Sequence, residues 1–244
     1  MVGSFKKIGF FSALILPALL LLGYEIGGAN LWLIHGFVFV LVPLMDFLIN
    51  TDTSNVPKAA ISKMTQEYFY RFVTFAWVYI QMAVLIWGFY VVSSADFLWW
   101  EWVAFTSGMA LITGGIGITV AHELGHKAEK IEQFYAKVLL MTVSYMHFFI
   151  EHNRGHHVRV ATPEDPATSR FGESFYAFWW RSVRDGYLSA WELERTRLVK
   201  KGLSFWSIKN QMIWFQILPL GFAALAFLVF SALTNRLVWE VPVF

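Results

Sequence analysis

The sequence of residues 72–92 is FVTFAWVYIQMAVLIWGFYVV, a stretch without aspartate, glutamate, lysine or arginine. A helix needs roughly 20 consecutive apolar residues to cross about 30 Å of hydrocarbon, so this stretch predicts a membrane-spanning helix. Four other stretches have the same character, and each can satisfy its backbone hydrogen bonds internally as a helix. The five predicted spans are approximately residues 8–23, 31–49, 72–92, 103–121 and 211–233.

The composition of the whole chain agrees with several membrane spans. Of its 244 residues, 57% are hydrophobic and only 15% are charged, which is more apolar surface than a soluble domain of this length can bury. A cleaved signal peptide is the alternative interpretation of the first stretch, because Lys6 and Lys7 precede it. No small-residue cleavage pattern follows, and the second stretch begins after a short loop, so a helical hairpin is favoured. We therefore expect an all-α integral membrane protein.

The basic residues lie unevenly about the predicted spans. The loops around Glu25 and Asp96 contain no lysine or arginine, whereas nearly all basic residues fall on the other side of the membrane. The positive-inside rule then places the N-terminus and residues 122–210 in the cytoplasm. This divides the chain into residues 1–121 with four spans, a cytoplasmic or interfacial insert at 122–210, and residues 211–244 with the fifth span. The net charge of +2 is too small to indicate nucleic-acid binding.

Two segments between the spans carry local signals. Residues 50–62 are rich in turn-forming residues and predict a connector on the cytoplasmic side. Residues 138–150 form an apolar stretch too short to span, which predicts a buried helix or one half-embedded in the membrane. Pro163 and Pro166 are expected to end the helical structure that follows it. The chain has no cysteine, which excludes disulfides, thiolate zinc sites and iron–sulfur clusters, so any electron carrier must be a separate protein.

Five of the seven histidines fall into two groups, His122 with His126, and His152 with His156 and His157. Residues four apart lie on the same face of a helix, so His122 and His126 can bind one metal, and so can His152 and His156. His157 points about one third of a turn away from His156 and can reach a neighbouring metal. Five imidazoles exceed the needs of one tetrahedral zinc, and imidazole also suits iron and copper. The pattern favours two metals.

The first group alone permits a different interpretation. Residues 122–126 read HELGH, which has the form of the zinc-protease motif with Glu123 as general base. A zinc protease would leave His152, His156 and His157 without a role, so it is the less favoured alternative.

Both motifs together resemble a known family. Residues 122–127 read HELGHK and residues 151–166 read EHNRGHHVRVATPEDP. They resemble the membrane-bound alkane 1-monooxygenases, or alkane omega-hydroxylases, of the integral-membrane histidine-rich diiron desaturase and hydroxylase superfamily. The resemblance covers the spans and both motifs, essentially the whole chain. A fatty-acyl desaturase or hydroxylase on the same scaffold is the alternative.

The resemblance implies a non-haem diiron centre that uses O₂ to hydroxylate the terminal carbon of a medium- or long-chain alkane. It also implies electrons from rubredoxin and its reductase, and a bacterial inner-membrane location. Glu123 and Asp165 would orient imidazoles from outside the ligand shell. The metal ligands that the resemblance implies are His122, His126, His152, His156 and His157. It implies further histidines and a sixth span beyond Phe244, so we expect the chain to be C-terminally incomplete.

Three other features have no settled role. His147 lies in an aromatic setting before the second group, and we expect it to orient a ligand or to pack in the core. His35 lies within an apolar span, where burial beside a backbone acceptor is favoured over metal binding. The basic residues of 195–201 suit either anionic membrane lipid or an acidic electron carrier.

Overall fold

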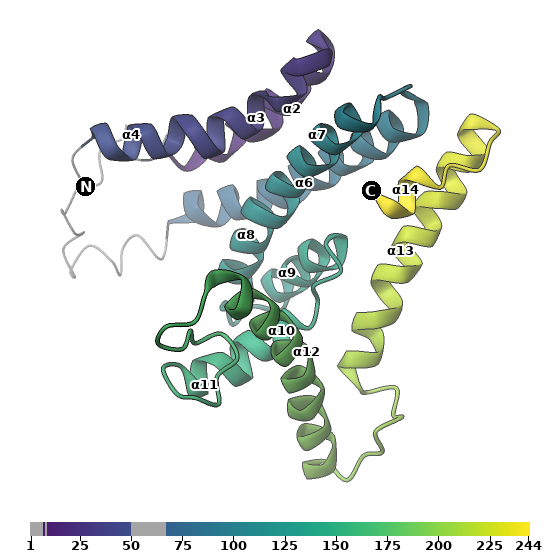
Figure 1. Cartoon of the computed structure of the whole chain (residues 1–244). Helices are drawn as coiled ribbons and strands as arrows, with labels where there is room; N and C mark the ends of the chain where they lie inside the picture. Colours follow the sequence, from purple (N-terminus) through teal and green to yellow (C-terminus); the bar gives the residue numbers. More distant parts are fainter. Residues whose placement is uncertain (1–6, 8, 50–66) are drawn as a thin grey trace. The chain divides into compact units, whose positions relative to one another are not determined.

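The computed structural model describes residues 7, 9–49 and 67–244, and over these residues every regular element is helical (Figure 1). The all-α prediction is confirmed. The predicted connector at residues 50–62 lies outside the described residues. The chain divides into two compact units, a first unit of residues 1–120 and 226–244 and a second unit of residues 121–225.

Five helical stretches of the described residues are long and apolar enough to cross a membrane, as predicted. They combine α-helix with short 3-10 and π-helical segments, which keep the backbone hydrogen-bonded within each stretch. The stretches are Gly9–Ile26, Gly28–Leu48, Tyr68–Ser94, Trp99–Gly125 and Gln211–Thr234. Their elements are η1 (Gly9–Leu14), α2 (Ile15–Ile26), η2 (Gly28–Trp32), α3 (Leu33–Gly36), η3 (Phe37–Leu41), α4 (Val42–Leu48), α6 (Tyr68–Ser94), α7 (Trp99–Ala110), η4 (Leu111–Ile116), α8 (Gly117–Gly125) and α13 (Gln211–Thr234).

A glycine turn joins the first two stretches into the predicted helical hairpin. Gly27 and Gly28 have φ angles of 77° and 57°, in the left-handed region that residues with a Cβ rarely adopt. The side chain of Asn30 donates a hydrogen bond from Nδ2 to the carbonyl oxygen of Gly27 at 3.0 Å. Gly23 packs so closely on Asn30 that a Cβ on Gly23 would overlap the backbone carbonyl of Asn30. The hairpin therefore depends on the absence of side chains at its turn.

The apolar core of the first unit includes a buried polar pair. Phe105 and Leu20 are 0% exposed, and so is the polar side chain of Gln81. The Oε1 atom of Gln81 accepts a hydrogen bond from Nε1 of Trp77 at 3.0 Å. Gly117 lies directly against the Gln81 amide, where a Cβ would overlap it. The pairing satisfies a polar group that would otherwise be costly to bury.

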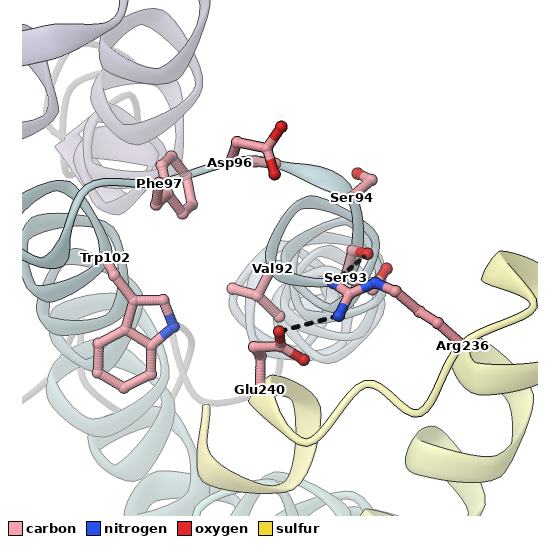
Figure 2. A pocket seen from close by; sticks show the side chains of 9 residues that line it. Val92, Ser93, Ser94, Asp96, Phe97, Trp102, Arg236 and Glu240 are labelled. Atoms are coloured by element: carbon pink, nitrogen blue, oxygen red, sulfur yellow. Dashed lines mark hydrogen bonds and ion pairs between the residues drawn. The ribbon is translucent and has the colours of Figure 1, made fainter.

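A polar pocket of about 480 Å³ lies in the first unit, where the end of α6 meets the segment after α13 (Figure 2). Arg236 donates hydrogen bonds to the carbonyl oxygen of Ser93 at 2.9 Å and to Oε1 of Glu240 at 3.0 Å. Glu240 begins α14 (Glu240–Val243), and the ring of Phe244 stacks on Phe105 with centroids 5.9 Å apart. These contacts fasten residues 236–244 to the first unit.

The second unit is built around one long helix. Its elements are the end of α8 from Ala121, α9 (Lys130–Thr142), α10 (Phe148–Glu151), η5 (His152–His156), α11 (His157–Arg159), α12 (Phe175–Lys200) and the first part of α13. Ser174 caps α12, because its Oγ accepts a hydrogen bond from the backbone nitrogen of Ala177 at 3.3 Å. Buried residues recur every fourth position along α12, at Gly186, Ala190, Glu194 and Leu198. Elements α10 and η5 pack against this helix.

The predicted helix over residues 138–150 is wrong, because the structure breaks it in two. Helix α9 ends at Thr142, and α10 begins only at Phe148. Between them Ser144 has a φ of 53°, a left-handed conformation that cannot continue a right-handed helix. The later boundary agrees with the prediction, since α11 ends at Arg159, ahead of Pro163 and Pro166.

The close packing at Gly23 yields a stability prediction. Gly23→Ala should destabilise the protein by about 1–3 kcal/mol, because the added methyl group must displace backbone rather than a flexible side chain. Gly36→Ala is the control on the other arm of the hairpin, where a Cβ meets nothing within 4 Å. That change should be neutral or stabilising by up to about 1 kcal/mol. Thermal unfolding of the detergent-solubilised protein measures both, and equal melting temperatures would contradict the expected packing.

Candidate metal centre

The first two predicted ligands lie at the end of a membrane-spanning stretch. His122 belongs to the last turn of α8, and His126 follows directly after that helix. The backbone nitrogen of His126 still donates to the carbonyl oxygen of His122 at 3.3 Å, so the helical spacing continues to His126. Their Nε2 atoms lie 3.1 Å apart. The spacing of four residues therefore brings the two imidazoles together, edge to face with ring centroids 4.5 Å apart.

The histidines of the second group do not meet as they would in an α-helix. His152 to His156 form η5, a π-helical segment in which the hydrogen-bonded repeat is five residues rather than four. The Nε2 atoms of His152 and His157 are 3.0 Å apart, whereas the ring of His156 stacks beside that of His152 with centroids 5.3 Å apart. The wider turn thus brings His157, rather than His156, over His152.

Four of the five predicted ligands converge. The Nε2 atom of His126 lies 3.0 Å from that of His152 and 3.3 Å from that of His157. One ligand atom from each of His122, His126, His152 and His157 lies within 4.8 Å of the others. Two nitrogens bound to one metal at about 2.0–2.1 Å are themselves roughly 3 Å apart, so this donor set fits a metal ion.

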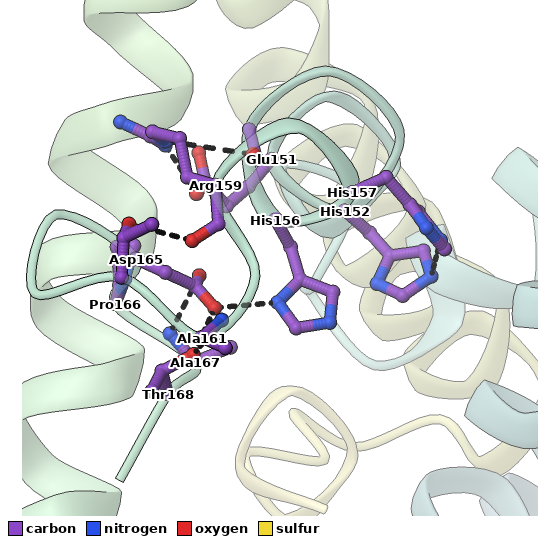
Figure 3. Close-up of polar contacts among 12 residues, drawn as sticks. Glu151, His152, His156, His157, Arg159, Ala161, Asp165, Pro166, Ala167 and Thr168 are labelled. Carbon is purple, nitrogen blue, oxygen red and sulfur yellow. Dashed lines mark hydrogen bonds and ion pairs between the residues drawn. The ribbon is translucent and has the colours of Figure 1, made fainter. Parts of the chain in front are cut away.

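His156 lies beside this group with one ring nitrogen already in use (Figure 3). Its Nδ1 donates to Oδ2 of Asp165 at 2.8 Å, which leaves Nε2 as the atom for a metal. Asp165 is 1% exposed and also accepts from the Thr168 hydroxyl at 2.6 Å and from the backbone nitrogen of Ala167 at 3.1 Å. Burial would raise the pKa of Asp165, but these hydrogen bonds hold it below its ordinary value. Asp165 is therefore an ionised acceptor that fixes the orientation of His156.

The other two residues expected to assist the metal lie apart from the imidazoles. Glu123 forms an ion pair with Lys127 on an exposed surface. His147 packs between the rings of Tyr145 and Tyr187, at centroid distances of 4.5 Å and 5.2 Å. Burial lowers the pKa of His147 to about 4. His147 is therefore a neutral, packed side chain at neutral pH.

Two of the converging imidazoles, those of His126 and His152, are held neutral. The pKa of His152 is lowered to about 3, first by burial and then by the neighbouring histidines. Burial and the nearby His122 and His157 likewise lower the pKa of His126. A neutral imidazole keeps a lone pair on one ring nitrogen, which is the form that binds metals. His126 and His152 are consequently in the form that can bind a metal at neutral pH.

His35 has a local partner of its own. Its Nε2 lies 2.9 Å from the Ser107 hydroxyl within the first unit. His35 is therefore a half-buried histidine whose partner is a side-chain hydroxyl rather than the expected backbone acceptor.

Sequence reasoning missed the charged residues behind η5. Arg159 donates to Oε1 of Glu151 at 2.8 Å, and Arg154 donates to Oε2 of Glu194 at 3.3 Å. One signal was present for Glu194, which lies four residues from both Ala190 and Leu198 and so on the apolar face of its helix. A charge at such a position predicts a buried, paired carboxylate.

Comparison with known proteins agrees with this arrangement. The Fatty acid desaturase family model matches residues 97–244, more than half of the chain. The chain is 36% identical to an alkane 1-monooxygenase of Pseudomonas putida, over 85% of this chain and 53% of that protein. It is 40% identical to alkane 1-monooxygenase 1 of Alcanivorax borkumensis, over 76% of this chain and 46% of that protein.

A more distant relative is named for a different substrate. The xylene/toluene monooxygenase hydroxylase component of Pseudomonas putida is 27% identical over 48% of this chain and 32% of its own length. The chain spans about half the length of the first two curated relatives. The family match and these relatives confirm the resemblance that the two histidine motifs indicated, and the chain therefore belongs to the fatty acid desaturase family, together with the alkane 1-monooxygenases.

Proposed function

We propose that this protein is a rubredoxin-dependent alkane 1-monooxygenase that converts medium- or long-chain alkanes to primary alcohols. The convergence of four imidazoles, with a fifth beside them, is the observation that carries the proposal. The names of the relatives support the substrate class and the reaction. Because the chain spans about half of those relatives, the activity is a proposal for the whole protein.

The five imidazoles divide naturally between two irons. We assign His122, His126, His152 and His157 to one iron because their ligand atoms lie within 4.8 Å of one another. His156 would contribute Nε2 to the second iron, since its Nδ1 is bound to Asp165. When bound, the diiron centre would supply the activation of O₂ and the oxidation of a terminal C–H bond.

The residues of the chain prepare this chemistry in three ways. Lowered pKa values keep His126 and His152 neutral, so that their lone pairs are free for metal. Asp165 keeps the proton of His156 on Nδ1 and so directs Nε2 outward. The apolar spans provide a setting from which an extended alkane can approach by its end, and orientation then selects the terminal carbon.

Electron supply and location complete the proposal. A chain without cysteine has no thiolate redox centre, so a separate carrier of the rubredoxin type, with its reductase, would deliver the electrons. The excess of basic residues on one side supports a cytoplasmic position for the metal centre and the N-terminus, and the proposed location is a bacterial inner membrane.

A fatty-acyl desaturase or hydroxylase is the second candidate. The match to the Fatty acid desaturase family model favours it. A zinc protease suits the arrangement less well, because Glu123 pairs with Lys127 while His152 and His157 join the histidines of the HELGH motif.

Product analysis distinguishes alkane oxidation from acyl desaturation. Membranes from the native host, given octane, O₂, NADH, rubredoxin and its reductase, should form 1-octanol. Omission of rubredoxin should stop product formation because the chain has no electron-transfer sulfur centre. Disruption of the gene should abolish it as well. If disruption of the gene instead removes a double bond from fatty acyl chains and leaves octane oxidation unchanged, the desaturase becomes the better-supported function.

Iron content tests the ligand assignment. His152→Gln should lower the affinity of the purified protein for iron by more than about tenfold, because loss of even an outer partner typically costs roughly 10–100-fold. His35→Gln is the matched control, since His35 bonds to Ser107 and belongs to a different unit. Elemental analysis should find iron rather than zinc in both the wild-type protein and the control. Stoichiometric zinc in protein purified from iron-replete cells would contradict the diiron proposal.

The Asp165–His156 contact yields a separate prediction. Asp165→Asn removes the negative charge that holds the proton on Nδ1, and we expect iron affinity to fall by about 10–100-fold. Glu164→Gln makes the same chemical change at the adjacent exposed carboxylate and should leave affinity unchanged. Equilibrium competition with a coloured chelator measures both variants. Equal affinities would show that the carboxylate does not assist His156.

A further inference from the structure

Glu194 is a buried charge for which metal binding and alkane oxidation provide no role. It lies on the inner face of α12 and is 0% exposed. Its two oxygens accept hydrogen bonds from Nε of Arg197 at 2.7 Å, Nη2 of Arg197 at 2.6 Å, the backbone nitrogen of Gln211 at 2.7 Å and Nη1 of Arg154 at 3.3 Å. Burial would raise the pKa of Glu194, but hydrogen bonds from Arg197 and Gln211 outweigh it and keep the pKa below its usual value. The carboxylate is therefore ionised and joins α12 to η5 and to the start of α13.

Arg154 connects this carboxylate to the metal centre. It lies in η5, two residues after His152 and three before His157. Successive helical residues turn by roughly 80–100°, so Arg154 points to about the opposite side of the helix from His152. Its Nη2 also donates to the side-chain oxygen of Gln211 at 3.1 Å. Arg154 thus holds the back of the helix whose front carries the ligands.

A second contact holds η5 from its flanks (Figure 3). Glu151 precedes η5, and Arg159 lies at the end of α11. The Nη2 atom of Arg159 donates to Oε1 of Glu151 at 2.8 Å and to the hydroxyl of Ser189, on α12, at 2.7 Å. Gly155 lies against both charged groups, and a Cβ there would overlap them. The back of η5 therefore has little room to shift.

The helical register of η5 decides which histidines meet. In the π-helical register His157 faces His152, with 3.0 Å between their Nε2 atoms. In an α-helical register residues four apart would meet, so His156 would face His152. His156 would then lose its hydrogen bond to Asp165. Since π-helical turns are rare and short, an outside restraint is needed to favour one.

We propose that Glu194, acting through Arg154, is a positioning residue that holds η5 in its π-helical register and so directs His152 and His157 to one metal. The proposal rests on the metal centre proposed above. It concerns the orientation of ligands, and Glu194 itself touches no metal, substrate or oxygen.

The test uses Co²⁺ as a spectroscopic probe of the purified, metal-free chain. Glu194→Gln and Arg154→Gln each remove the charge pairing between the two residues. Glu192→Gln is the matched control, because Glu192 lies on the same helix and forms an exposed ion pair with Arg195. The Glu192 side chain is 64% accessible and that of Arg195 is 63% accessible. His157→Ala supplies the reference spectrum of a site without that ligand. Circular dichroism checks that each variant keeps its helix content.

We expect both variants at the pairing to bind Co²⁺ about 10–100-fold more weakly, and at saturation to show a visible spectrum like that of His157→Ala. The double variant should be no weaker than the weaker single variant, because the two residues act as one unit. In the metal-free protein, hydrogen exchange of amides 148–159 should be faster in Glu194→Gln and in Arg154→Gln than in the wild type. It should be unchanged in Glu192→Gln.

Contrary outcomes separate this proposal from the metal centre. A folded Arg154→Gln protein with the affinity, spectrum and hydrogen exchange of the wild type would overturn the positioning role alone. If Glu194→Gln fails to fold, Arg154→Gln decides, because Glu194 keeps its bonds to Arg197 and Gln211 in that variant. If the wild-type chain binds no Co²⁺, the metal centre and the positioning role are both overturned.

Discussion

Hydrocarbon offers no hydrogen-bond partner to a peptide group, and the architecture of this protein depends on that constraint. Every long apolar stretch of the described residues is helical, and the first histidine pair of the candidate metal centre lies at the end of one such stretch, Trp99–Gly125. A site built on helices can gather ligands only at positions set by helical repeat. Three or four residues separate side chains on one face of an α-helix, and five separate them in a π-helix.

The protein uses both repeats in one site. The first pair, His122 and His126, follows the α-helical repeat, and the second pair, His152 and His157, follows the π-helical one. Gathering four imidazoles would be costly if they were charged, because like charges repel. Burial and mutual proximity lower the pKa values of His126 and His152, which keeps these two imidazoles neutral at neutral pH.

The sequence was informative wherever composition or an α-helical repeat decided the outcome. Five spans follow from uninterrupted apolar stretches, and the contact of His122 with His126 follows from a spacing of four. The sequence was uninformative where two backbone conformations compete by a small free energy. Nothing in residues 152–156 distinguishes a π-helical turn from an α-helical one, and Ser144 carries no glycine-like signal for its left-handed φ of 53°. The pairing of Arg154 with Glu194 depends on tertiary packing, since the two residues lie 40 positions apart.

The use of charge behind η5 has a physical rationale of its own. A buried ion pair often contributes little to stability, because desolvation offsets most of the attraction between its charges. Apolar packing would stabilise the contact between η5 and α12 as well, but apolar side chains tolerate a shift of one position and can repack. A guanidinium group that must meet Oε2 of Glu194 and the Gln211 side chain at once has few acceptable positions. Directional bonds of this kind select one helical register over its neighbour, and selection of a register is what a pair of imidazoles about 3 Å apart requires.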